Sequence, residues 1–109
     1  HFLFTVIFIS TSNLAHSFQL TVAWDPNNEP DIAGYKVYYG TVSSHYIFNV
    51  DVRNYTSVTI SDLELSKTYY FAVTAYDAYG NESNFSDEIS YKGHAPKSMP
   101  WIPLLLLDD

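Results

Sequence analysis

The chain has 109 residues, of which 47% are hydrophobic and 17% aromatic, and a single domain of this length can bury a core without help from metals or disulfides. Its 5 basic and 12 acidic side chains give a net charge of −7, which argues against nucleic acid as a partner because phosphate backbones bind to positive surfaces. The chain contains no cysteine, and this excludes disulfides, thiolate zinc sites, iron–sulfur clusters and thiol nucleophiles.

Residues 1–17 have the features of an export signal that is truncated upstream, since neither a basic segment nor a methionine precedes the apolar run 2–9. Ala15 and Ser17 are the small residues that a cleavage site after Ser17 requires. The pattern therefore predicts a mature N-terminus at Phe18 and a secreted, periplasmic or cell-surface location. The apolar run is too short to span a bilayer, which needs about 20 residues. The alternative is a buried edge strand, because the same run is rich in β-forming residues.

From residue 18 onward, apolar and polar residues alternate with a period of two, which is typical of half-buried strands, and no helical period appears. Turn-forming residues separate these segments every eight to twelve residues or so, as in a β-sandwich. The predicted strands cover residues 18–24, 34–40, 46–52, 57–63, 68–76 and 86–92.

The alternation also predicts which side chains enter the core. The first strand ends before Pro26 and Pro30, because proline has no N–H to donate to a strand partner. On the second strand, Tyr35, Val37 and Tyr39 share one face. We expect that face to be buried.

Three groups of residues carry a resemblance to a known family. They are Val22-x-Trp24-Asp25-Pro26, then Asp31-x-x-Gly34-Tyr35-x-Val37-Tyr38-Tyr39-Gly40, and then Leu63 with Tyr69-x-Phe71-x-Val73-x-Ala75-Tyr76. Together with residues 77–90 they resemble a fibronectin type III domain of the kind found in exported bacterial proteins. The resemblance covers residues 18–92 and implies an all-β fold, an immunoglobulin-like antiparallel β-sandwich. It also implies that Trp24 is the core tryptophan and that Tyr69 is the tyrosine corner, whose hydroxyl bonds back to the preceding connection.

The sequence departs from this family at three places. Leu65 and Ser66 replace the usual Pro-Gly turn, so we expect a looser corner there. Because the second family strand follows the predicted cleavage site directly, the first family strand, strand A, is predicted to be short or missing. If the signal is removed, one sheet keeps an open edge that attracts a partner strand. Residues 93–109 have no counterpart in the family.

The tail at residues 93–109 reads as a linker followed by an apolar segment, WIPLLLL, at residues 101–107. This segment is too short to cross a membrane, and too apolar to remain in water. We expect it to pack against the domain in the same chain, against a second copy or against a neighbouring domain. Self-association through the tail or the open edge is therefore predicted.

No pattern of catalytic residues emerges from the chain. The histidines lack the spacing of metal ligands, no G-x-S-x-G motif is present, and a small filled sandwich has no cleft for paired catalytic carboxylates. The four histidines are His1, His16, His45 and His94. The sequence therefore predicts that the protein is not an enzyme and needs no cofactor.

Acidic residues gather in two loops that the resemblance places at one end of the sandwich, and neither loop contains Lys or Arg. Their mutual repulsion would favour a bound cation, and Ca²⁺ suits oxygen ligands. The calcium candidates are Asp25, Glu29, Asp31, Asp77 and Glu82, with Asp87 and Glu88 close by in the sequence. The alternative is that these are solvated turn residues that bond their own backbone.

Ten tyrosines exceed what a core of this size can hide. Tyr38, Tyr70 and Tyr76 occupy outward-facing positions on strands expected to be neighbours, so we expect them to lie together. An exposed aromatic row would stack on sugar rings or bind a protein. The alternative is ordinary cross-strand pairing that stiffens the sheet.

These features predict a non-catalytic extracellular module with a binding, adhesion or spacer role and with a protein or a carbohydrate as its ligand. The alternative is an accessory fibronectin type III module of a larger secreted enzyme, acting on carbohydrate or another extracellular substrate. The reading frame on either side of residues 1–109 distinguishes the two, because a further domain there would favour the accessory module.

Overall fold

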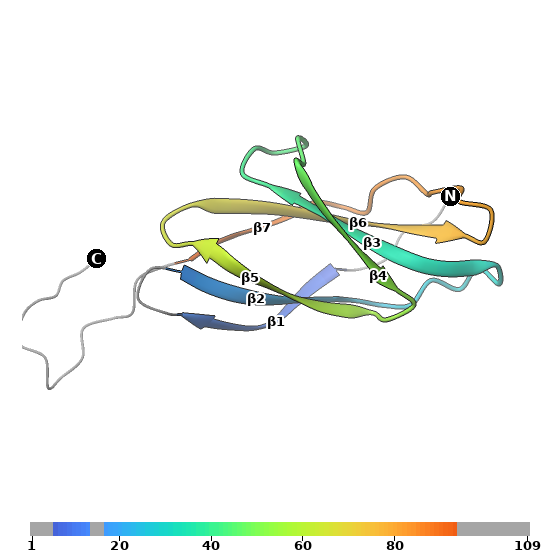
Figure 1. Ribbon diagram of the computed structural model, residues 1–109, viewed down its shortest axis with the longest axis horizontal. Helices are drawn as coiled ribbons and strands as arrows, with labels where there is room; N and C mark the ends of the chain where they lie inside the picture. Colours follow the sequence, from blue (N-terminus) through green and yellow to red (C-terminus); the bar gives the residue numbers. More distant parts are fainter. Residues whose placement is uncertain (1–5, 14–16, 94–109) are drawn as a thin grey trace, which may run out of the picture.

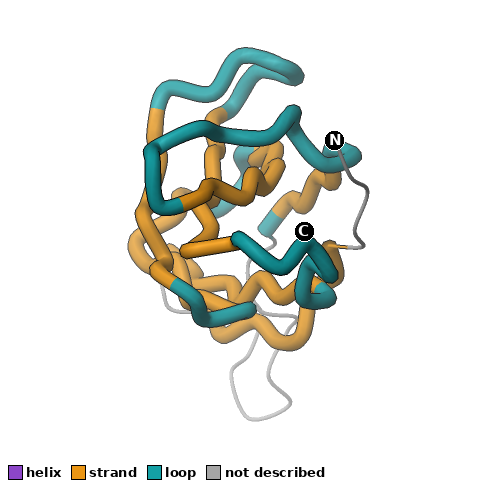
Figure 2. Tube along the Cα trace, turned by 90° about the vertical axis from the view of Figure 1, so that its right-hand side faces the viewer, coloured by secondary structure: helices purple, strands orange, loops and turns teal. Residues whose placement is uncertain are grey.

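A computed structural model describes residues 6–13 and 17–93, with side chains for residues 17–93. Within these residues seven antiparallel strands form two sheets that face each other (Figure 1). Figure 2 looks along the long axis and shows strands and loops, without a helix, in the described part of the chain. The described residues contain no helix that is long and apolar enough to cross a membrane. The predicted antiparallel β-sandwich is confirmed.

The smaller sheet has three strands in the order β1 (Val6–Asn13), β2 (Ser17–Trp24) and β5 (Ser57–Glu64). The prediction that the first strand is short or missing is wrong. The eight residues of β1 pair with β2 from Val6 opposite Trp24 to Asn13 opposite Phe18. Residues 6–9 of the apolar run therefore lie in an edge strand, as the alternative predicted for their backbone, because β2 pairs with β1.

Cleavage after Ser17 stays a prediction, and residues 14–16 before that bond lie outside the described residues. The pairing of β1 with β2 gives such cleavage a structural consequence. It would remove β1 and leave β2, which pairs on its other side with β5, with an open edge.

The larger sheet has four strands in the order β4 (Phe48–Arg53), β3 (Ile32–Gly40), β6 (Thr68–Asp77) and β7 (Ile89–Lys92). The two central strands, β3 and β6, pair over most of their length, from Ile32 opposite Asp77 to Gly40 opposite Tyr70. The predicted strands all occur, although β4 and β7 begin later than expected. The apolar tail segment lies outside the described residues.

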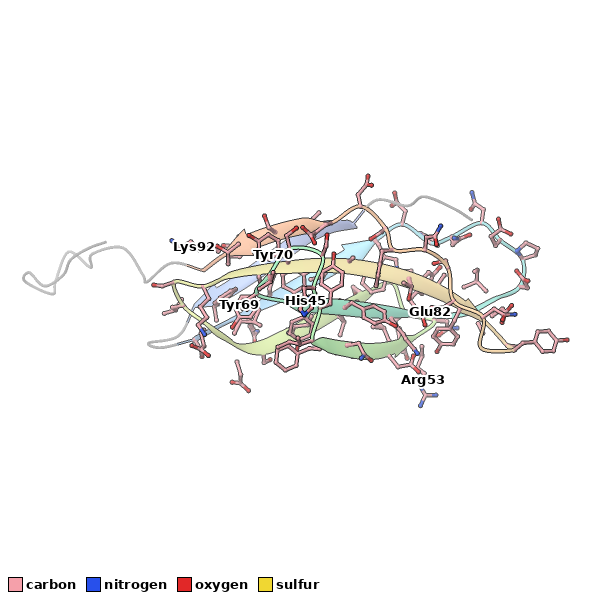
Figure 3. The ribbon with its side chains drawn as sticks, turned by 90° about the horizontal axis from the view of Figure 1, so that it is seen from above. His45, Arg53, Tyr69, Tyr70, Glu82 and Lys92 are labelled. Atoms are coloured by element: carbon pink, nitrogen blue, oxygen red, sulfur yellow. The ribbon has the colours of Figure 1, made fainter. Side chains whose placement is uncertain are left out.

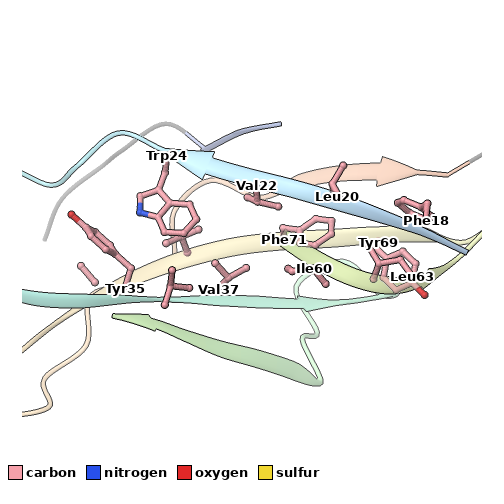
Figure 4. Close-up of a cluster of buried hydrophobic side chains, with 13 residues drawn as sticks. Phe18, Leu20, Val22, Trp24, Tyr35, Val37, Ile60, Leu63, Tyr69 and Phe71 are labelled. Atoms are coloured by element: carbon pink, nitrogen blue, oxygen red, sulfur yellow. The ribbon is translucent and has the colours of Figure 1, made fainter. Parts of the chain in front are cut away.

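The core lies between the two sheets and is built from the alternating residues of β2, β3, β5 and β6 (Figure 4). Tyr35 and Val37 are buried as predicted, and Tyr39 packs against the core while partly buried. Trp24 is 4% exposed and meets Tyr35 edge to face, with ring centroids 5.7 Å apart. The burial predicted for this tryptophan is confirmed.

The tyrosine corner is also present. Tyr69 is buried, and its hydroxyl accepts a hydrogen bond of 2.9 Å from the backbone N–H of Glu64, across the connection between β5 and β6. In the turn between them, Ser66 has a φ of 71°, in the left-handed region that glycine favours, and its N–H donates to the carbonyl of Gly93. The turn thus keeps a glycine-like backbone without a glycine.

Candidate binding surface

The connection between β6 and β7 lies against β6 through two serines. The N–H of Ser83 donates to the carbonyl of Ala75 at 2.8 Å, and its hydroxyl accepts from the N–H of Ala75 at 2.9 Å. Ser86 makes the same pair of bonds with Val73, also at 2.8 and 2.9 Å. The N–H groups of β6 here donate to serine hydroxyls and not to the backbone carbonyls of a neighbouring strand. The regular strand β7 therefore begins at Ile89 and not at residue 86.

This connection brings a phenylalanine onto the outer face of the larger sheet, which Figure 3 views from above. Phe85 meets Tyr38 of β3 edge to face, with centroids 5.0 Å apart, and it meets Tyr46 in the same way at 5.2 Å. The centroids of Tyr38 and Tyr46 are 6.5 Å apart. Edge-to-face pairs contribute about 0.5–1.5 kcal/mol beyond their buried area. We call Tyr38, Tyr46 and Phe85 the ring cluster, and half of the Phe85 surface remains exposed.

Glu82 holds one side of the ring cluster. Its carboxylate accepts hydrogen bonds from the hydroxyls of Tyr38 and of Thr74, the latter at 2.7 Å, and the Lys36 ammonium lies 3.8 Å away. Burial opposes ionisation of Glu82, but these hydrogen bonds and Lys36 outweigh it and hold the pKa of Glu82 below its usual value. Burial and the bond to Glu82 raise the pKa of Tyr38 to about 12. The pair therefore remains carboxylate and phenol at neutral pH.

Glu88 holds the other side of the cluster. Its carboxylate accepts from the hydroxyl of Ser43 at 2.6 Å, the N–H of Ser44 at 2.7 Å and the hydroxyl of Tyr46 at 2.6 Å. Burial opposes ionisation of Glu88 too, but the three hydrogen bonds outweigh it and lower the pKa of this carboxyl. All three donors belong to residues 41–47, which we call the β3–β4 hairpin. One carboxylate thus fixes the whole hairpin against the β6–β7 connection.

Of the three tyrosines predicted to form an exposed row, Tyr38, Tyr70 and Tyr76, only Tyr38 belongs to the ring cluster, and a binding role for the row stays a prediction. In the register of the two central strands Tyr38 lies opposite Ala72, so Tyr70 and Tyr76 stand two and four residues along β6 from its partner. Tyr76 instead donates a hydrogen bond of 2.7 Å from its hydroxyl to Asp51. Alternation places side chains on a face, but register decides which of them meet.

The sequence pattern missed the other two members of the cluster. Tyr46 lies in the hairpin rather than in the strand where it was expected, and Phe85 lies in a connection held by serine side chains. A period of two carries no information about the direction of side chains outside a regular strand. No signal in the chain pointed to either residue.

The calcium candidates are not brought together. Among the residues that the structure describes, no group of three or more His, Asp or Glu side chains is placed to hold a metal ion. The Asp77 carboxylate accepts from the N–H groups of Tyr79 and Asn81 within its own turn, both at 2.9 Å, and Glu82 serves the ring cluster. Exposed loop positions are occupied by Asp25, Glu29 and Asp31. Asp77 therefore fits the alternative, in which these acidic residues are turn residues that bond their local backbone.

The Glu82→Gln variant is expected to lose about 1 kcal/mol of unfolding free energy at neutral pH, allowing for the partial exposure of this carboxylate. Because the folded pKa lies below the unfolded value of 4.5, the ionised group stabilises the fold above that value and loses its effect as the pH falls through the folded pKa. The gap in melting temperature between variant and unchanged chain should therefore shrink in acid. A gap that stays constant with pH would contradict this, and the exposed Glu29→Gln is the control.

Comparison with known families and curated proteins gives one family and two relatives. The family model of the fibronectin type III domain matches residues 9–92. Over 96 residues the chain is 32% identical to Chitinase A1 of Niallia circulans, covering 84% of this chain and 13% of the chitinase. It is 31% identical to a Kelch domain-containing protein of Saccharolobus solfataricus, covering 88% of this chain and 12% of that protein. The chain thus spans only a small part of the length of these relatives.

Solved structures share the fold. The fibronectin type III domain of the human collagen alpha-1(XX) chain superposes with a TM-score of 0.63 at 22% identity, over 88% of this chain and 87% of that one. The corresponding domain of human contactin 1 gives a TM-score of 0.65 at 20% identity, over 84% and 76%. At identities this low, the similarity shows only that the fold is shared.

Proposed function

This chain belongs to the fibronectin type III family, and from that premise we propose that it is a non-catalytic binding module of an extracellular protein, with the ring cluster as its binding surface. The observation that carries the proposal is a half-exposed Phe85 whose two ring neighbours are each hydrogen-bonded to a carboxylate. Because these rings are already held in place, binding a ligand to them costs little conformational entropy.

The chemistry of this surface suits an uncharged polysaccharide. Aromatic rings stack on the apolar faces of sugar rings, and a net charge of −7 disfavours anionic polymers. Glu82 accepts two hydrogen bonds from the described residues, so its carboxylate keeps lone pairs for a sugar hydroxyl. The likeness to Chitinase A1 makes chitin the first polymer to test.

The test is depletion of the 109-residue chain from solution by insoluble chitin and by cellulose. Phe85→Ala is expected to weaken binding about tenfold, which corresponds to roughly 1.4 kcal/mol. The matched control is Tyr55→Ala, which removes an exposed ring from the turn between β4 and β5. Failure of the unchanged chain to bind either polymer, or equal losses in both variants, would contradict the proposed role.

A second candidate function is a spacer or accessory module in a larger secreted enzyme. It is favoured by the 32% identity to a stretch that makes up only 13% of Chitinase A1. The full reading frame around residues 1–109 tests it. A catalytic domain on either side would support the accessory role, and start and stop codons bordering this domain would contradict it.

A further inference from the structure

The β3–β4 hairpin and the first residue of β4 expose three large apolar side chains. Val42, Ile47 and the first residue of β4, Phe48, are between 47% and 66% exposed. The hairpin and Phe48 together contain no Asp, Glu, Lys or Arg. We call these three side chains the hairpin surface, and they are half of the six large hydrophobic side chains that the described residues expose.

This surface is held in place rather than displayed by a loose loop. Glu88 binds the hairpin through three hydrogen bonds of 2.6 to 2.7 Å. A bridge pairs Val42 with His45 across the turn. Phe48 stacks on Tyr39, with centroids 5.1 Å apart. A fixed apolar surface of this kind gains stability when another apolar segment covers it.

The described chain ends on the same side of the sandwich. Gly40 lies opposite Tyr70, which lies opposite Ser90, so two strand spacings of about 4.8 Å separate Gly40 from Ser90. The backbone N of Ile47 is 3.3 Å from where a Cβ on Gly40 would stand. Gly93 follows three residues after Ser90, which puts it roughly 15 Å from Ile47 on these spacings. Figure 1 shows the hairpin and the end of β7 in the same half of the molecule.

The segment beyond Gly93 has the length and the composition to cover this surface. Trp101 comes eight residues after Gly93, and eight extended residues reach about 26 Å, which exceeds the required span. We propose that residues 101–107, WIPLLLL, dock on the hairpin surface of the same chain. Both partners are apolar and free of charge, so their contact desolvates no ionised group.

A short linker favours docking within one chain over docking on a second copy. A tether of this length holds the segment near its site at an effective concentration in the millimolar range. A second copy would also have to approach against the repulsion between two chains that each carry a net charge of −7.

The test uses the fluorescence of Trp101 in the full 109-residue chain. The other tryptophan, Trp24, is buried, and its signal is measured alone in Trp101→Phe and subtracted. In the unchanged chain the Trp101 emission is expected to be blue-shifted and poorly quenched by acrylamide. In Ile47→Asp we expect a red shift and a several-fold rise in the quenching constant, because a charge then occupies the docking surface.

The matched control is Tyr79→Asp, which places the same charge at a 92% exposed position in the turn after β6. It should leave the Trp101 signal unchanged, and circular dichroism verifies that all variants keep the fold. Val42→Asp provides a second disruption and should act as Ile47→Asp does. Full quenching of Trp101 in the unchanged chain, or equal responses in Ile47→Asp and Tyr79→Asp, would overturn the proposal. Protection of Trp101 that disappears on dilution would assign the docking to a second copy instead and would also overturn it.

Discussion

Replacing Trp24 with alanine is expected to lower the free energy of unfolding by about 3–5 kcal/mol. The indole is buried between the sheets against Tyr35, so its removal leaves a cavity that neither sheet can close without moving. Domains of this size have a total stability of about 5–15 kcal/mol, so the loss is a large share of the whole. Urea unfolding followed by circular dichroism measures it.

The Trp24→Phe variant separates lost volume from lost hydrogen bonding. The indole Nε1 is buried and has no hydrogen-bond partner among the described residues, so phenylalanine gives up ring volume without breaking a bond. We expect a cost of about 1–2 kcal/mol, well below that of alanine. A loss below about 1 kcal/mol for Trp24→Ala would contradict the position of this residue in the core.

Introducing valine at Gly34 is expected to cost about 2–3 kcal/mol, because a side chain there overpacks a filled site. A Cβ on this buried residue would stand 2.4 Å from the Tyr76 hydroxyl oxygen and 2.9 Å from the carbonyl oxygen of Arg53. The tyrosine ring can turn away, but the carbonyl belongs to the backbone of β4 and moves only with the strand. Thermal unfolding of Gly34→Val measures the cost.

A double-mutant cycle with Tyr76→Ala tests the origin of this effect. Removing the ring should restore part of the stability of Gly34→Val, since the contact with the carbonyl of Arg53 remains. Strict additivity of the two changes would show that the tyrosine does not occupy the space over the glycine. A valine variant as stable as the unchanged chain would contradict the close approach itself.

The strands and the core are determined largely by local sequence. Alternation along β2 and β3 places Trp24, Tyr35 and Val37 inside because only one face of each strand meets the other sheet. The resemblance identified the Tyr69 corner, and its hydroxyl indeed bonds the N–H of Glu64. These features depend on residues close together in the chain, so a period of two or a short motif is enough to predict them.

The first strand shows where local information stops. An apolar run of β-forming residues satisfies both an export signal and an edge strand. Only the pairing with β2, from Val6 to Asn13, shows that residues 6–13 form a strand. Whether the run is also removed by processing depends on a protease, not on the fold, so the N-terminus of the mature protein is the measurement that decides it.

The ring cluster was decided mainly by tertiary structure. Sequence alternation by itself determined that Tyr38 faces outward, but Tyr46 and Phe85 reach it from a hairpin and from an irregular connection. The sequence predicted Glu82 and Glu88 only as members of an acidic loop. Their carboxylates accept hydrogen bonds from the hydroxyls of Tyr38 and Tyr46, each more than 40 residues away in the chain, and so fix these two rings. Such contacts follow from strand register and from the path of loops across a sheet, and neither is written in the period of a single strand.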